Sequence, residues 1–511
     1  MKKLLTFRKK LYLLLGIATL FACSDDNKEI PAPKPVEPDK AKIELNLTDV
    51  QIPRSGGTVE AIVTANQEDW TYECTEDWIS VRKSGDKLIL SADENASSLR
   101  KEATVVVTVV GEGADNTASD SIHILQNDAA LVIEIEVPDG AMMYAPVMGT
   151  VNCQIDWGDD TVDQIKGTFD GLFVPQPSHI YERGGVYQIR ISGDMSKMEI
   201  GLNFDDTKTA YVTSVIQWGN TGLTSMFKAL YRCANLTSIP GDTDDSFTEV
   251  TDFSDAFSGC KSLLEIPADL FVNGSKITTL SFCFEDSGLK TIPAGLLDNC
   301  TAAMSFTMTF SGCPLIALPD ELFSKCVSAE TFSSLFFNCQ LLQSIPENLF
   351  KGCTKTAKFS YVFQLCSSLT DVPDGLFRTC AGAKDFGGAF SSCYSLETVP
   401  ENLFADNPLV GSFIYCFMDC TSLKAIPAGL FDGNRAVTQF QGTFRGCMQV
   451  SGESPYTLFG AEKVHLYERS KNTGEFAAPV DFVYCFSDCT KLSDYSSMEE
   501  NYPDWSRTFI R

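Results

Sequence analysis

A fixed period runs through the second half of this 511-residue chain and limits the folds open to it. An aliphatic residue followed by proline recurs eight times, at intervals of 26 or 27 residues. The prolines are Pro240, Pro267, Pro293, Pro319, Pro346, Pro373, Pro400 and Pro427. A weaker unit follows at residues 447–459, and a final half unit begins at Phe482. Such periods are typical of stacked repeats, because one unit buries its apolar residues only against its neighbours.

The residues around each proline predict a local structure for the unit. Phe390, Cys393 and Leu396 stand ten, seven and four residues before Pro400, and Phe386 precedes Phe390 by four. Residues four apart share one face of a helix, so this spacing predicts a short helix before the proline. The proline would then begin a second short helical turn. Acidic residues after the prolines suit that helix start and need no catalytic role.

Other positions of the unit vary from copy to copy and are candidates for ligand contact. The residues between the conserved Leu and the Ile or Val are expected to reach solvent from a short extended segment. We therefore predict ligand-binding roles for Asp371, Glu397 and Lys424. Exposed aromatic residues would support sugar stacking. Tyr361, Tyr394 and Tyr415 either serve that purpose or pack between units.

The chain has 19 cysteines, 16 of them in the repeats. An exported protein would favour disulfides. However, the cysteines recur at one equivalent site in each unit, which favours buried, unreactive thiols stacked along the array. The first set comprises Cys233, Cys260, Cys339, Cys366, Cys393 and Cys420, and a second comprises Cys300, Cys326, Cys353 and Cys380.

The N-terminus reads as a processed segment. Residues 1–22 combine five cations with a short apolar run, which is typical of a secretory signal and too short for a permanent span. The "LFAC" at residues 20–23 resembles a bacterial lipobox, which implies lipid attachment at Cys23. Residues 23–41 are acidic and proline-rich and predict an extended tether. The acidic run resembles the surface-export signal of Bacteroidetes lipoproteins, which implies an outer-membrane anchor facing the cell exterior.

Residues 42–128 alternate between apolar and polar over short runs separated by turn residues, which predicts a small β-sandwich. Trp70 and Trp78 are expected in its core, with stacking on sugar rings as the alternative. The segment resembles the BACON domain of Bacteroidetes proteins, a family linked to carbohydrate binding. The resemblance rests on Ser55–Thr58, the two tryptophans, Asn95–Arg100 and Gln126 with Asn127.

Residues 129–205 also predict strands. A Trp-Gly-Asp turn at residues 157–159 precedes a His-x-Tyr and a Gly-x-Tyr pair, and this arrangement resembles a PKD-type sandwich. Asp156, Asp159 and Asp160 could hold Ca²⁺, but three carboxylates at a tight turn more often bond their own backbone. We expect His179 to take part in packing.

The clearest repeat, "AFSGCKSLLEIPADLF" at residues 256–271, resembles the leucine-rich repeats of BspA-like bacterial surface proteins. The predicted fold is therefore multidomain: two all-β sandwiches followed by a leucine-rich-repeat α/β solenoid of 27-residue units at residues 206–511.

Composition narrows the function. The net charge of −27 repels phosphate backbones, so nucleic acid is not an expected partner. Three histidines in separate contexts and no glycine-rich phosphate loop favour a protein that is not an enzyme and has no metal or cofactor. We expect a cell-surface lipoprotein whose repeats bind a glycan, with a host or neighbouring-cell surface protein as the alternative ligand.

Overall fold

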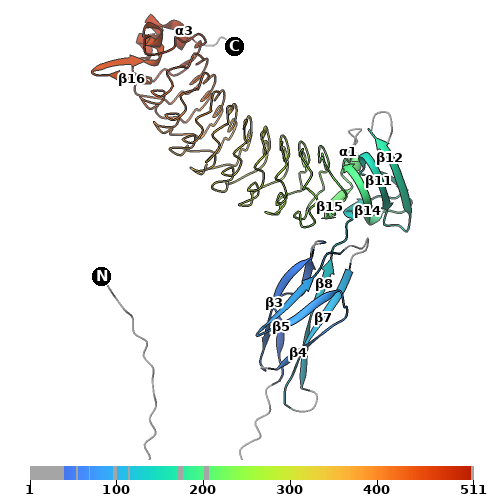
Figure 1. Cartoon of the computed structure of the whole chain (residues 1–511). Coiled ribbons are helices and arrows are strands. Elements are labelled where there is room, and N and C mark those ends of the chain that lie inside the picture. The colour runs from blue at the N-terminus through green and yellow to red at the C-terminus, as the bar shows by residue number, and fades with distance from the viewer. Residues whose placement is uncertain are drawn as a thin grey trace, which may run out of the picture.

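The computed structural model describes residues 40–52, 54, 56–67, 69–95, 101–112, 116–170, 176–200, 206–472 and 474–507. The predicted signal segment and Cys23 lie outside these residues. Along the chain follow a β-sandwich, a second β-sheet, a long stack of repeats and a C-terminal cap (Figure 1). None of the helices in the described part has the length and apolar composition needed to cross a bilayer.

The first region is a sandwich of two four-stranded sheets around its own core. One sheet has the order β1 (Ile43–Leu45), β3 (Gly57–Ala65), β6 (Lys87–Ala92) and β5 (Ile79–Ser84). The other has the order β2 (Asp49–Ile52), β8 (Thr117–Gln126), β7 (Lys101–Val110) and β4 (Trp70–Cys74), with β2 and β8 parallel. Burial alternates along β7, as expected where one face covers a core.

The tryptophans of this sandwich serve its packing. Trp70 is buried in the core, as predicted. Trp78 is half-buried against the same core, and its indole Nε1 donates a hydrogen bond to the Glu102 carbonyl oxygen at 3.3 Å. Neither ring is therefore fully open to a ligand.

The second region is a five-stranded sheet beside a two-stranded ribbon. The sheet order is β12 (Val162–Phe169), β11 (Met148–Asp156), β14 (Gly185–Lys197), β9 (Leu131–Val137) and β15 (Val212–Gln217). The ribbon pairs β10 (Ala141–Tyr144) with β13 (Ser178–Tyr181), and the short helix α1 (Asp206–Thr209) precedes β15. The core of this sheet continues without a break into the repeats.

The predicted α/β leucine-rich-repeat solenoid is wrong. The described residues form mostly β-sheets, with four short helices, and none of these lies between residues 223 and 450. The units consist of tight turns joined to the next unit by single-residue parallel bridges. One row of bridges runs through Ser225, Asp252, Thr279, Ser305, Thr331, Lys358, Asp385, Ser412, Gln439 and Asp481. We call residues 223–492 the repeat stack; its units lie side by side in Figure 1.

Backbone hydrogen bonds explain why the predicted helices do not form. The N–H groups of Gly388 and Phe390 donate to the next unit, whereas that of Ala389 donates to the carbonyl three residues earlier. A helix would instead direct every N–H four residues back within the unit. Successive turns also bring residues four apart to one side, so Phe386 and Phe390 both reach the core. The four-residue spacing is therefore common to both structures.

Aromatic columns form the centre of the stack. The rings of Phe363, Phe390 and Phe417 are nearly parallel, with centroids 5.6 and 5.5 Å apart. Offset stacking at this distance adds to the free energy of apolar burial. Leu376 is 2% exposed, which confirms its predicted core position.

The last units are covered by a cap. It contains the hairpin of β16 (Tyr456–Phe459) and β17 (Glu462–His465), the 3₁₀ helix η1 (Leu466–Lys471), and the helices α2 (Tyr495–Asn501) and α3 (Pro503–Ser506). The Trp505 ring stacks on Phe482 at 4.7 Å and lies near the ring of Phe486, where the aromatic column ends. A cap of this kind shields the final apolar surface of a repeat array.

Candidate ligand-binding groove

Three tyrosines occupy the same backbone position in alternate units of the C-terminal half of the stack. Tyr361, Tyr415 and Tyr484 have φ values of 60°, 56° and 63°, in the left-handed region. The intervening units place Gly388 and Gly442 at this position, with φ values of 61° and 56°. Left-handed backbone costs a non-glycine residue roughly 1–2 kcal/mol, but glycine adopts it freely. Tyrosine is thus kept where glycine would be less strained, a pattern that often marks a functional position.

Each tyrosine ring lies over the glycine of the next unit. A methyl group added to Gly388 would come within 2.3 Å of the Tyr361 ring, and one added to Gly442 within 2.6 Å of the Tyr415 ring. The glycines therefore make room for the rings, and both are buried. Tyr361 is nevertheless 41% exposed, so part of its ring is open to solvent.

An open groove of about 610 Å³ lies beside Tyr361 and crosses four units. Its lining includes Ser360, Tyr361, Lys384, Asp385, Ser412 and Gln439. Asp385 is held in place because its carboxylate accepts hydrogen bonds from the Ser360 hydroxyl at 2.6 Å and the Gly387 N–H at 2.8 Å. The groove thus combines an aromatic ring with fixed polar groups, as ligand sites commonly do.

The second tyrosine lies in the same electrostatic environment. Burial raises the pKa of Tyr415; nearby Asp481 and the hydroxyls of Tyr361 and Tyr484 raise it further, while Arg445 lowers it. The tyrosine hydroxyls are therefore neutral hydrogen-bonding groups at physiological pH. A row of neutral hydroxyls and aromatic faces suits a polar ligand with apolar patches, such as a sugar.

The predicted ligand-binding residues lie outside the lining of this groove. Asp371, Glu397 and Lys424 are all exposed, as expected for the variable positions. The ammonium of Lys424 pairs with the carboxylate of Glu397, and Asp371 forms a parallel bridge with Thr398. Their part in ligand binding stays a prediction. The sequence pattern did single out Tyr361, which lines the groove; Tyr394 is also exposed but occupies a different repeat position.

The aspartates of the Trp-Gly-Asp turn form the turn itself. Asp156 accepts a hydrogen bond from the Gly158 N–H at 2.9 Å, and Asp159 accepts from both the backbone and the hydroxyl of Thr161. His179 contacts Asp159 at 2.7 Å and stacks on Trp157, so its predicted packing role is confirmed. Among the described residues, no group of three or more acidic, histidine or cysteine side chains is arranged to hold a metal ion.

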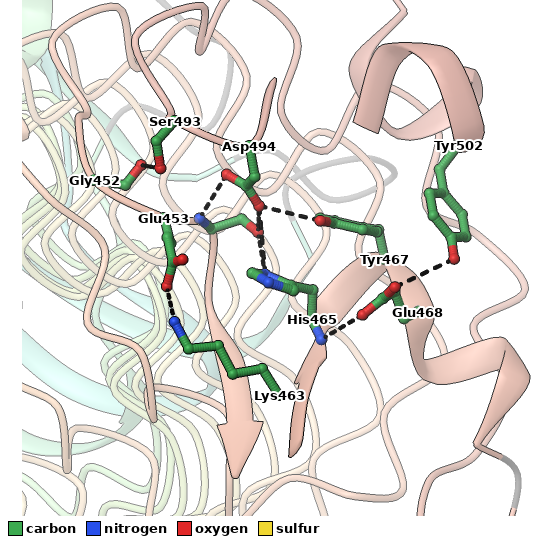
Figure 2. A network of polar contacts seen from close by, with 10 residues as sticks. Gly452, Glu453, Lys463, His465, Tyr467, Glu468, Ser493, Asp494 and Tyr502 are labelled. Carbon is green, nitrogen blue, oxygen red and sulfur yellow. Dashed lines mark hydrogen bonds and ion pairs between the residues drawn. The ribbon is translucent and has the colours of Figure 1, made fainter. Parts of the chain in front are cut away.

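One polar cluster in the cap could not be predicted from the sequence (Figure 2). The Ser454 hydroxyl donates to the Asp494 carboxylate at 2.5 Å and lies 3.0 Å from His465 Nδ1, while Asp494 also lies 3.3 Å from that nitrogen. Tyr467 donates to Asp494 as well, at 3.2 Å. In a catalytic triad, the hydroxyl and the carboxylate contact opposite ring nitrogens. Here both contact one nitrogen and Ser454 is fully buried, so the cluster ties the hairpin to α2.

The cysteines described in the structure are free thiols, as the repeat register predicted. Cys393 Sγ donates to the Phe363 carbonyl oxygen at 3.2 Å, and Cys420 makes the equivalent bond to Phe390. Burial raises the pKa of Cys393 well above its ordinary value. A buried protonated thiol is a poor nucleophile and metal ligand, so these residues serve packing.

No family model, curated protein or solved structure matches this chain. The resemblances to BACON, PKD-type and BspA-like sequences therefore stay predictions. The class that the described residues define is a β-rich protein with a capped repeat stack and a tyrosine-lined groove.

Proposed function

We propose that this protein is a non-enzymatic cell-surface lipoprotein that binds an extracellular glycan in the groove beside Tyr361. The lipid anchor would be attached at Cys23, and the tether and the two β-regions would hold the repeat stack away from the membrane. The observation that carries the proposal is the recurrence of Tyr361, Tyr415 and Tyr484 in left-handed backbone, each of the first two lying over a glycine of the next unit.

Several properties of the groove support a sugar over other ligands. Sugars present apolar ring faces that stack on aromatic side chains and hydroxyls that pair with fixed polar groups. The groove offers Tyr361 for the first interaction, and Asp385, Ser412 and Gln439 for the second. Lys384 and Asp385 have opposite charges, so this lining does not select an ionic ligand.

A protein ligand remains the second candidate, because one outward-facing row of the stack includes apolar side chains. Leu264 and Ile316 stand three residues before their prolines and are 44% and 48% exposed. The equivalent positions further along carry Glu397 and Lys424, so this row becomes polar toward the C-terminus. Apolar exposure of this kind suits protein contact better than sugar contact.

The test is a glycan array probed with the chain from residue 24 onward, without the lipidated cysteine. Binding to one or more glycans that is lost in Tyr361→Gly is the expected result. Glycine occupies the same position in neighbouring units, so this change keeps the backbone conformation. Tyr394→Ala is the matched control, since Tyr394 is similarly exposed at 45% but lies outside the groove lining. Absence of binding to every glycan would contradict the proposal.

The anchor is tested separately. Cys23→Ser should release the protein from the membrane fraction, because the acyl chains provide the apolar burial that holds it there. Unchanged fractionation would contradict lipid anchoring and leave the groove proposal standing.

A further inference from the structure

We propose that the groove holds a neutral, extended, β-linked polysaccharide that runs along the axis of the repeat stack and contacts tyrosine at every second unit. This inference rests on the glycan-binding function proposed above and adds the class of ligand, its direction and its register.

The direction follows from the bridges between units. Lys358, Asp385, Ser412 and Gln439 are joined by parallel bridges, so equivalent positions of neighbouring units lie in a row. The groove includes residues from all four of these units, and therefore follows the stack axis. A ligand that fills the groove extends across several units in this direction.

The register follows from the tyrosine and glycine alternation. Bridged backbones lie roughly 4.8 Å apart, so residues two units apart are separated by about 10 Å. Tyr361 and Tyr415 are two units apart, and Tyr484 is two further, because Gln439 bridges Asp481 across the insertion. Two sugar rings of an extended β-linked chain cover a similar length. Alternate rings of such a chain would therefore meet successive tyrosines on the same face.

The five units with this alternation differ from the units before them. There the same left-handed position carries Lys228, Asp255, Phe282, Met308 and Ser334, with no regular spacing of one residue type. The proposed site is thus confined to the C-terminal half of the stack, where the groove lies.

The charges of the site favour a neutral chain. Lys384 and Asp385 are adjacent and opposite in sign in the lining, and the protein as a whole carries −27. A polyanionic glycan would meet an unfavourable long-range potential. A peptide strand is also disfavoured here, because the N–H groups of Phe386, Gly388 and Phe390 already donate to the next unit.

The experiment is a calorimetric titration with neutral β-1,4-linked glucose, xylose and mannose oligomers of one to eight units, using the chain from residue 24 onward. For the matching sugar, we expect affinity to rise at least tenfold from the disaccharide to the tetrasaccharide, as a second tyrosine is reached, and to level off by about six units, once a third tyrosine is engaged. In Tyr415→Gly, the gain with length should disappear, while Tyr394→Ala should retain the full length dependence.

The outcomes separate this inference from the proposed function. Glycan binding on the array that shows no dependence on chain length, or that is limited to charged or branched sugars, would overturn the extended neutral ligand and leave the glycan-binding function standing. Binding that depends on length but survives Tyr361→Gly and Tyr415→Gly together would overturn the tyrosine register. Absence of any glycan ligand would overturn both.

Discussion

The β-sandwich at residues 43–126 and the repeat stack bury their apolar residues in different ways. In the sandwich, β7 and β8 pair over ten residues and cover a closed core made by strands distant in sequence. In the stack, each unit touches the equivalent residues of its neighbours, as Phe363, Phe390 and Phe417 show. The sandwich therefore ends at its own edges, whereas the stack needs a cap and offers a surface that repeats along its length.

This comparison is broken most severely by a charge in the centre of the stack. Leu376→Asp would bury an uncompensated carboxylate among the phenylalanine columns, at a cost of roughly 3 kcal/mol or more. We expect the repeats around residue 376 to lose protease resistance together, while the sandwich, which has a separate core, stays protected. Limited proteolysis with fragment mass analysis measures both at once.

The control for this substitution is Ala381→Asp, because Ala381 is exposed in the same unit. It should retain the protease resistance of the unchanged protein. Loss of resistance in the sandwich together with the stack would show that the two regions unfold as one.

The sequence gave different amounts of information about the two regions. Period-two alternation predicts strands directly, because a strand buries every second residue, as β7 does. The 27-residue period correctly predicted buried positions such as Phe390 and Leu396, since burial depends on stacking alone. It could not distinguish a helix from successive turns, because both bring residues four apart to one side.

The candidate groove was only partly accessible from the sequence. Tyr361 and Tyr415 were noted as aromatic residues, but their place relative to Gly388 and Gly442 depends on backbone conformation. Comparing the position two residues after the first phenylalanine in every unit would have revealed the alternation. The cluster of Ser454, His465 and Asp494 had no such signal, because an insertion brings residues 40 apart into contact.

A second change separates the repeating surface from the core beneath it. Gly388→Ala places a methyl group 2.3 Å from the Tyr361 ring and requires left-handed backbone of alanine. We expect a loss of about 1–2 kcal/mol in the free energy of unfolding, together with weaker binding of any glycan identified, because the ring must move.

A double-mutant cycle with Tyr361→Gly identifies the cause of this loss. The double variant should recover part of the stability, since it removes the clash and leaves the backbone cost. Gly387→Ala serves as the neighbouring control, because its φ is not in the left-handed region and the nearest atom is 3.1 Å away. Equal losses without recovery in the double variant would show that the ring does not lie over Gly388.

A third change concerns the joint between the two regions. Asp244 of the stack accepts hydrogen bonds from the Arg54 N–H at 2.9 Å and from Asn127 Nδ2 at 3.0 Å, both in the sandwich region. Burial raises the pKa of Asp244, although these hydrogen bonds oppose the rise. Its carboxylate therefore contributes more stability when protonated, and this contribution is lost as pH rises through the folded-state pKa.

The expected consequence is a small shift in the pH dependence of melting. Between the unfolded and the raised folded-state pKa, the unchanged protein should gain stability on acidification relative to Asp244→Asn, which cannot titrate. The difference should amount to at most a few degrees in a protein of this size. Identical pH profiles for the two proteins would contradict the raised pKa.

The smallest expected effect on stability comes from the other face of the stack and decides between the two candidate ligand surfaces. Asp371→Asn, Glu397→Gln and Lys424→Gln together remove exposed charges and one surface ion pair, which is worth less than about 1 kcal/mol. Melting should therefore shift by no more than a few degrees. Because these residues lie outside the groove lining, the groove proposal expects unchanged glycan affinity in the triple variant, whereas the prediction from sequence variation expects weaker binding. A titration of the triple variant beside Tyr361→Gly distinguishes the two: weakening only in the triple variant would move the site to the row of Asp371, Glu397 and Lys424, and weakening only in Tyr361→Gly would place it in the groove.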